Sequence, residues 1–94
     1  MNKLIIDTSD NKLVTVGLKI GEKEFTLSKK VTFNGVQFAL PMIDSLLNKY
    51  SISVKEIDLI DINVGPGSLT GIKVGMAIAN ALSYCLKIPI NYNK

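Results

Sequence analysis

Apolar and polar residues alternate along the first third of the chain, which is the pattern of half-buried β-strands. Every second residue within 13–20 is a large apolar one on the same side, and residues 24–30 repeat this pattern with Phe25 and Leu27. Residues 3–7 form a shorter apolar segment. Because only short polar segments separate the three, the sequence predicts three strands joined as an antiparallel meander.

The spacing of apolar residues changes to three and four after residue 34, which predicts a helix that ends near residue 50. We expect the following residues to form its buried side: Val36, Leu40, Ile43, Leu47 and Tyr50. Asn34 and Gln37 have the spacing of a capping box. Pro41 removes one backbone hydrogen bond, so we expect a kink or a late helix start near residue 40.

The second half of the chain predicts a strand, a long helix and a last short strand, over residues 59–64, 69–87 and 88–92. Ser53 and Glu56 mark a single short turn before them. The predicted order is βββαβαβ, and right-handed crossovers place both helices on one face of a mixed five-stranded sheet. The fold class is therefore a two-layer α/β domain. The opposite face is expected to be mostly polar, with these residues: Lys3, Asp7, Thr15, Lys19, Thr26, Ser28, Asp61 and Asn63.

The composition fits one small domain, because the 94 residues are 47% hydrophobic and 20% charged. No uninterrupted apolar run approaches the roughly 18 residues of a membrane span, and the first residues lack the pattern of a signal peptide. We therefore expect a cytoplasmic protein with no membrane partner. The single cysteine, Cys85, lies in an apolar helical pattern, which predicts a small core residue.

The types of charged residue exclude several kinds of site. The chain has no histidine and all its basic residues are lysines, which excludes a histidine base, a histidine-ligated metal and an arginine clamp. All eight acids lie at or before Asp61, where eight lysines balance them, so the net charge of +3 comes from Lys73, Lys87 and Lys94. Three dispersed lysines do not form the basic surface of a nucleic-acid-binding protein. We expect no metal, no cofactor and no direct nucleic-acid partner.

The segment NVGPGSLTG, residues 63–71, resembles a phosphate-binding loop between a strand and a helix. The side chains that would hold a phosphate or a hydrated Mg²⁺ there are Asp7, Thr8 and Ser68, with the backbone of Gly67. However, the sequence does not contain the established phosphate-binding motifs. Lys73 is not in the Walker position, and no acid follows Asp61 to bind a ribose.

A packing role for these glycines is the simpler interpretation. Gly65 and Gly67 permit backbone angles that other residues avoid, and Asp7 with Ser9 resembles a turn that bonds its own backbone. Small residues then recur every fourth position in the second helix: Gly71, Gly75, Ala79 and Ser83. We expect this small-residue ridge to let another helix approach closely.

Three segments, LIIDTSD, LPMIDSLL and GPGSLTGIKVG, together resemble the N-terminal lobe of the TsaB/YeaZ family of bacterial tRNA threonylcarbamoyladenosine biosynthesis proteins. The resemblance extends from Leu4 to about Pro89, although the family usually has Phe at position 69 and Arg at position 73. It implies one lobe of the actin/Hsp70-like ATPase fold, which is ribonuclease H-like. Residues 1–94 would form a single N-terminal lobe, and the second lobe of full-length members is absent.

The resemblance implies a scaffold and not an enzyme. Members of that family form homodimers and pair with TsaD, which transfers threonylcarbamoyl to adenosine 37 of tRNA, and TsaE joins them. We therefore expect a non-catalytic subunit that pairs with itself or with a TsaD-like protein, and a TsaE-like protein is a possible further partner. The alternative is the nucleotide-binding lobe of a small kinase or ATPase of the actin-like superfamily, with a site formed by Asp7, Thr8, Gly67 and Ser68.

Pairing in that family uses the helices of this lobe, and the sequence has surplus apolar residues on both. Phe38 and Met42 fall outside the predicted buried side of the first helix. Ile72 and Met76 lie beside the small-residue ridge of the second. We expect the partner interface to consist of these residues: Phe38, Met42, Ile72, Gly75, Met76 and Ala79.

Overall fold

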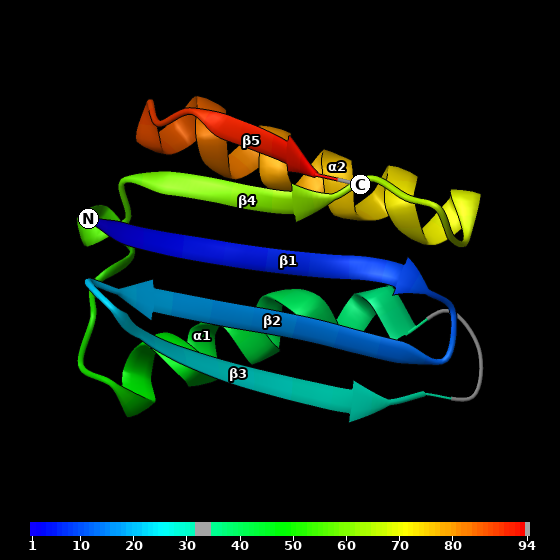
Figure 1. Cartoon of the computed structure of the whole chain (residues 1–94), viewed down its shortest axis with the longest axis horizontal. Coiled ribbons are helices and arrows are strands. Elements are labelled where there is room, and N and C mark those ends of the chain that lie inside the picture. Colours follow the sequence, from blue (N-terminus) through cyan, green and yellow to red (C-terminus); the bar gives the residue numbers. More distant parts are fainter. Residues whose placement is uncertain (32–34, 94) are drawn as a thin grey trace.

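One mixed sheet runs through the computed structural model, which describes residues 1–31 and 35–93 (Figure 1). Strand β1 (Asn2–Asp10) lies in the middle, and the strand order is β3-β2-β1-β4-β5. β2 (Leu13–Ile20) and β3 (Lys23–Lys30) form the antiparallel meander, while β4 (Leu59–Asn63) and β5 (Ile90–Asn93) run parallel to β1. The predicted βββαβαβ order and mixed sheet are therefore confirmed.

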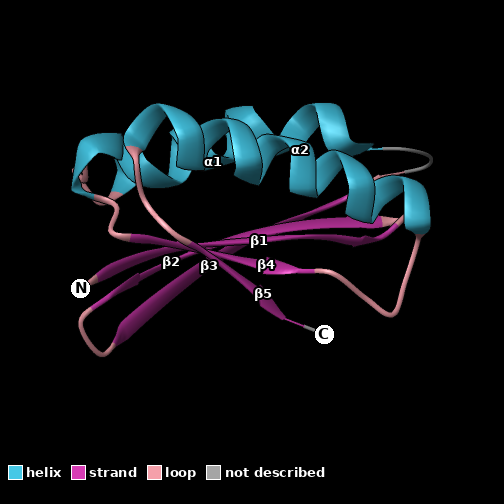
Figure 2. Ribbon diagram, turned by 90° about the horizontal axis from the view of Figure 1, so that it is seen from above, coloured by secondary structure: helices cyan, strands magenta, loops and turns pink. Residues whose placement is uncertain are grey.

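Both long helices cover the same face of this sheet, as Figure 2 shows. They are α1 (Ala39–Lys49), which follows the short 3₁₀ helix η1 (Gly35–Phe38), and α2 (Leu69–Leu86). A second 3₁₀ turn, η2 (Val54–Glu56), lies between α1 and β4. The prediction of a two-layer α/β domain is therefore confirmed. The connections before and after β4 are both crossovers between parallel strands, and right-handed crossovers place both helices on the same face of the sheet.

The helix boundaries follow from local chemistry. Pro41 is the third residue of α1, where its missing N–H has no intrahelical partner to lose, and the expected late start near residue 40 is confirmed. The capping box at η2 is present, because the Ser53 N–H donates to Glu56 Oε1 at 2.9 Å and the Ser53 side chain accepts from Lys55 N. The capping box expected at Asn34 lies outside the described residues.

The core lies between the sheet and the helices. The side of α1 that reaches it agrees in part with the expectation, because Ile43 and Leu47 are buried as predicted. Leu40 is 53% exposed, although the spacing of apolar residues predicts a buried position for it. The buried side of α1 has a regular three-four spacing and consists of Ala39, Met42, Ile43, Leu46 and Leu47. The expected buried side differs because its apolar series begins at residue 36, which lies within η1 and not within α1. A 3₁₀ turn has three residues instead of 3.6, so its phase does not continue into α1.

The buried side of α2 also differs from the expectation. The small-residue ridge faces the chain's own sheet and not another helix. Gly71 and Gly75 are buried against β1, where a Cβ atom on either would overlap atoms of Thr8. Because the ridge is turned inward, Val74 and Leu82 are only half-buried and Cys85 is exposed, so the prediction of Cys85 as a core residue is wrong.

Among the described residues, α2 is the one helix that is long and apolar enough, by length and composition alone, to cross a membrane. The expectation that no segment has this length overlooked it, because Lys73 and Asn80 interrupt the apolar run. The core helix of a globular protein passes the same test. In α2 22% of the residues are buried: its small residues pack on the sheet, and its outer side contributes to the groove described below.

Candidate functional site

Asp7 and Thr8 lie next to each other near the end of β1 but point to opposite faces of the sheet. The Asp7 side chain is on the open face. Its Oδ1 accepts hydrogen bonds from the Ser9 N–H at 3.0 Å and the Ser9 hydroxyl at 2.6 Å, and its Oδ2 accepts one from Asn63 Nδ2 at 3.2 Å. The carboxylate therefore takes part in the self-bonded turn that the sequence predicts, and it also accepts a hydrogen bond from the neighbouring strand.

Thr8 is 1% exposed and lies between the sheet and α2. Its hydroxyl donates to the Gly71 carbonyl at 2.6 Å, which fastens the first turn of α2 to the central strand. Asp7 and Thr8 consequently do not converge on one ligand position. The two residues hold the loop and the helix in place from opposite sides of the sheet.

The glycine loop packs directly on the end of β1. The Ser68 N–H donates to the Ser9 carbonyl at 2.6 Å, and a Cβ atom on Gly67 would overlap that same carbonyl. Ser68 is the N-cap of α2, as expected, because its hydroxyl accepts from the Gly71 N–H at 3.3 Å. Gly65 has φ +128°, which other residues rarely adopt. These contacts give the glycines a packing role, and the use of Gly67 and Ser68 for a nucleotide stays a prediction.

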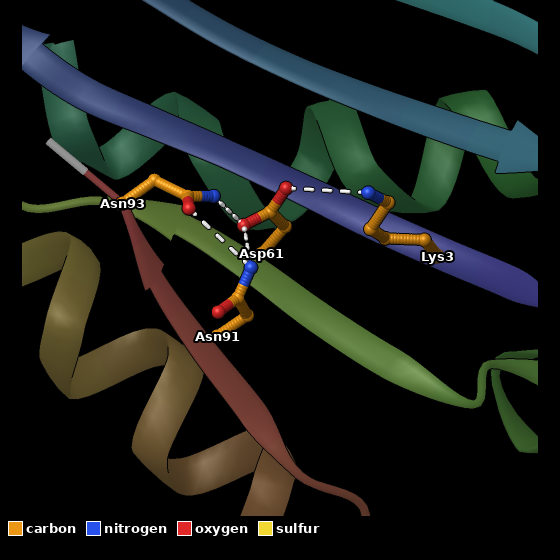
Figure 3. A network of polar contacts seen from close by, with 4 residues as sticks. All are labelled: Lys3, Asp61, Asn91 and Asn93. Atoms are coloured by element: carbon orange, nitrogen blue, oxygen red, sulfur yellow. Dashed lines mark hydrogen bonds and ion pairs between the residues drawn. The ribbon is translucent and has the colours of Figure 1, made fainter.

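Asp61 forms a polar network on the open face that the sequence pattern does not predict (Figure 3). Lys3 Nζ lies 3.5 Å from Asp61 Oδ2, and Asn91 Nδ2 donates to Asp61 Oδ1 at 3.2 Å. Asn93 Nδ2 donates to the same oxygen. The carboxylate thus joins β1, β4 and β5. Asp61 was noted as a polar residue of this face, but its partners are 30 or more residues away along the chain.

No group of three or more His, Cys, Asp or Glu side chains is placed to hold a metal ion in the part of the chain that the structure describes. The polar side chains of the glycine loop bond mainly to the chain itself. The loop borders a shallow cleft that Ser9 and Gly67 line together with neighbouring residues.

The second candidate site is an apolar groove between the two helices, with a volume of about 340 Å³. We call it the α1–α2 groove, and the following residues line it: Leu40, Val74, Ala77, Ile78, Ala81, Leu82 and Cys85. Six of these seven belong to α2, and Leu40 projects from α1. An apolar hollow beside a projecting leucine is typical of a surface that binds another protein.

None of the six residues predicted as a partner interface lines this groove, and four of them are buried. Met42 and Ile72 are each 7% exposed, and Gly75 and Ala79 are buried. The other two, Phe38 and Met76, are half-buried. The expectation that Met42 and Ile72 are surplus to the core is therefore wrong, because α1 and α2 are rotated relative to the predicted phases. A direct role of the six in pairing stays a prediction.

Comparisons with known proteins support one family. The family model described as TsaD, tRNA N6-adenosine threonylcarbamoyltransferase, matches residues 34–91. The TsaB protein of Bacillus subtilis is 32% identical over 94 residues, covering 97% of this chain and 40% of that protein. The TsaB protein of Buchnera aphidicola from Schizaphis graminum is 38% identical, covering 93% and 41%. A transferase of the TsaD type from Legionella pneumophila is 35% identical over 54 residues, covering 57% and 16%.

A solved structure shows the same fold. YeaZ from Pseudomonas aeruginosa superposes with a TM-score of 0.89 at 24% sequence identity, over 97% of this chain and 42% of that one. The chain spans about two fifths of the length of the TsaB proteins that it matches. The expected α/β lobe, a mixed five-stranded sheet with two helices on one face, is therefore confirmed, and its fold matches that of YeaZ.

Proposed function

Because this chain belongs to the family that contains TsaD and the TsaB/YeaZ proteins, we propose that it is a non-catalytic partner subunit in the formation of threonylcarbamoyladenosine in tRNA. Its partner is a TsaD-like protein, which it contacts through the α1–α2 groove. A second copy of the chain and a TsaE-like protein are the other predicted partners. A cytoplasmic location is part of the same proposal.

The observation that supports this pairing most directly is the position of the groove. All seven lining residues lie within residues 34–91, the segment that matches the TsaD family model. The segment that builds this surface is therefore shared by proteins of both names. Two related chains can associate through equivalent surfaces much as two identical chains do.

The engagement of the polar residues supports a role without catalysis. Thr8 is buried and donates to a backbone carbonyl, and the Ser68 hydroxyl caps α2. The Asp7 carboxylate accepts three hydrogen bonds from the chain itself. Groups that act on a substrate must be within hydrogen-bond reach of it, whereas these are occupied in fixing the glycine loop.

Co-purification with the TsaD-like protein encoded in the same genome tests the proposal. Ala81→Lys places a charge in the groove at an exposed helix position and should abolish capture while the chain stays folded. Thr26→Lys adds the same charge to an exposed position on the opposite face of the sheet and should leave capture unchanged. Capture that resists Ala81→Lys would show that the groove is not the pairing surface.

The single cysteine offers a second measurement on the unmodified chain. Cys85 is exposed and lines the groove, so a thiol reagent should label it readily in the free chain. Bound partner should slow this labelling, because it covers the groove. Equal labelling rates in the free and bound chain would contradict docking at this surface.

The alternative function is nucleotide binding at the cleft beside the N-terminus of α2, which Gly67 and Ser68 line. Backbone N–H groups at a helix N-terminus attract anions. Calorimetric titration with ATP and Mg²⁺ tests it. A heat of binding that Ser68→Ala reduces would support this alternative, and no heat would exclude it.

A further inference from the structure

We propose that the free edge of β3 binds an extended acidic segment of another protein, which adds to the sheet as a further strand. This surface shares no residue with the α1–α2 groove, and the inference does not depend on the proposed function. It is carried by the open hydrogen-bonding edge of β3, by half-buried aromatic residues beside that edge, and by two lysines that lie over aromatic rings.

β3 is an edge strand, and no strand among the described residues pairs with its outer side (Figure 1). Its inner side is paired with β2 along the whole strand. In the same antiparallel register the Val31 N–H donates to the Lys12 carbonyl at 2.9 Å, so hydrogen-bonded pairs recur at every second residue from there. The backbone N–H and C=O groups of the residues between these pairs point outward: Glu24, Thr26, Ser28 and Lys30. An extended segment can bond to these groups without displacing any bond within the sheet.

The helix side of this edge is apolar and only half-covered. Phe25 and Leu27 are half-buried, although the residues that they pair with in β2 are buried. The Phe25 ring stacks on that of Tyr50, the C-cap residue of α1, with the ring centroids 3.8 Å apart. Side chains alternate between the two faces of a strand, so an added strand would place every second side chain beside Phe25 and Leu27 and cover them.

Two lysines border these apolar residues. Lys29 Nζ lies 4.8 Å from the centroid of the Phe38 ring, and Lys49 Nζ lies 5.7 Å from that of the Tyr50 ring. Both lysines are exposed, and within residues 1–31 and 35–93 neither ammonium group forms an ion pair. Attraction to the face of an aromatic ring favours one position of an ammonium group and leaves its charge available to an anion.

The positions of the lysines define the chemistry of the segment. Lys49 lies at the Phe25 end of the apolar residues, and Lys29 lies four residues along the same side of β3, about 13 Å away at 3.3 Å per residue. A segment with an apolar residue opposite Leu27 and a carboxylate two residues away on each side therefore matches the apolar and the basic positions together. Lysines on an edge strand disfavour a basic strand, and they disfavour a second copy of β3, which carries the same lysines. The occupant is accordingly acidic.

Hydrogen exchange of the unmodified chain tests the inference with a synthetic probe. The probe is a capped peptide in which glutamate, isoleucine and glutamate alternate with threonines. In the free chain the outward amides of Thr26 and Ser28 should exchange fast, whereas those of Phe25 and Leu27, which bond to β2, should be protected. When the peptide occupies nine tenths of the chain, exchange at Thr26 and Ser28 should slow about tenfold, because only the free tenth exchanges.

Peptide and chain variants test the charge pattern by fluorescence anisotropy. Glutamines in place of both glutamates should weaken binding about tenfold in 50 mM NaCl, since each exposed carboxylate–lysine pair contributes about two- to fivefold. Lys29→Gln/Lys49→Gln should have a similar effect on the acidic peptide and none on the glutamine peptide. The matched control Lys73→Gln/Lys87→Gln removes two exposed lysines from α2 and should bind like the wild type. In 500 mM NaCl the two peptides should differ by about twofold or less, because salt screens exposed charges.

Thr26→Pro tests the backbone bonds. The Thr26 N–H points outward, so proline removes a donor that an added strand needs and no bond to β2, and edge strands tolerate proline at such positions. Binding of the acidic peptide should fall about tenfold or more. Circular dichroism verifies that the variant is folded, and the exchange measurement on the unmodified chain decides the matter if it is not.

Unchanged exchange at Thr26 and Ser28, or binding of the glutamine peptide as tight as that of the acidic one, would overturn the inference. An equal effect of the control lysines would overturn it too. Protection of these two amides that rises with the concentration of the chain alone would place a second copy at this edge and would also contradict it. Ala81→Lys should leave peptide binding unchanged, so the inference and the proposed pairing through the groove can fail separately.

Discussion

A methyl group at Gly71 tests how α2 is seated on the sheet. Gly71 is buried in the first turn of α2, and a Cβ atom there would overlap the Thr8 carbonyl oxygen. The obstacle is the backbone of β1, which is paired with a neighbouring strand on each side. Neither element can move away without loss of other contacts. We therefore predict that Gly71→Ala destabilises the chain, although alanine is the better helix former.

The change in the free energy of unfolding caused by Gly71→Ala is the sum of a favourable helix-propensity term and unfavourable packing terms. Alanine is favoured over glycine in a helix interior by about 0.8–1.0 kcal/mol. Overpacking typically costs about 1–3 kcal/mol, and a shift of α2 would also stretch the hydrogen bond from Thr8 Oγ1 to the Gly71 carbonyl, a further cost of about 1 kcal/mol. The expected net loss is about 1–3 kcal/mol, from the roughly 5–14 kcal/mol that stabilise a domain of this length.

Urea unfolding followed by circular dichroism measures this loss. Ala77→Gly is the matched control, because Ala77 is exposed on the same helix and loses only helix propensity, about 0.5–1 kcal/mol. The midpoint of Gly71→Ala should fall further than that of the control, with an unchanged slope. A Gly71→Ala chain that is as stable as the wild type, or more so, would refute the described seating of α2.

Three further substitutions test other contacts. Thr8→Val removes the buried hydroxyl and should cost about 1–2 kcal/mol in the same assay, whereas Thr26→Val on the exposed face should stay within about 0.5 kcal/mol. Asp61→Ala removes the carboxylate that joins Lys3 to β5, so the amides of β5 should exchange hydrogen faster while those of β1 do not; equal protection of β5 would argue against the network. Leu40→Gln should change stability by no more than about 1 kcal/mol but weaken capture of the TsaD-like partner, and a failure to fold would contradict the exposed position of Leu40.

The topology was predictable because it depends on coarse features of the chain. Alternation over residues 13–20 and 24–30 has period two, the longer helical segments have a period near 3.6, and both patterns survive small errors in the boundaries. The crossover rule then leaves one arrangement for the helices on either side of β4. The helix caps at Ser53 and Ser68 were equally predictable, because in each the side chain and the backbone group that bond are close in sequence.

The helix faces were less predictable because they depend on the phase and not only on the period. The 3₁₀ turn η1 before α1 shifted the phase, which moved Leu40 outward and Met42 inward. The bonds of Asp61 to Asn91 and Asn93 could not be inferred from spacing at all, since they join strands about 30 residues apart. A register for β4 and β5 would have been required to anticipate them.

The seating of α2 accounts for the position of the candidate pairing surface. A ridge of small residues allows close approach of any neighbour, and in this chain the neighbour is the central strand, to which Thr8 fastens the helix. The glycines are consequently buried, and the larger apolar residues of α2 turn toward the space beside α1. Substitutions on the ridge should therefore alter folding, whereas a substitution at Ala81 should alter association alone. If a change at Ala81 altered the free energy of unfolding as much as one at Gly71, the groove would belong to the core and could not serve as a docking surface.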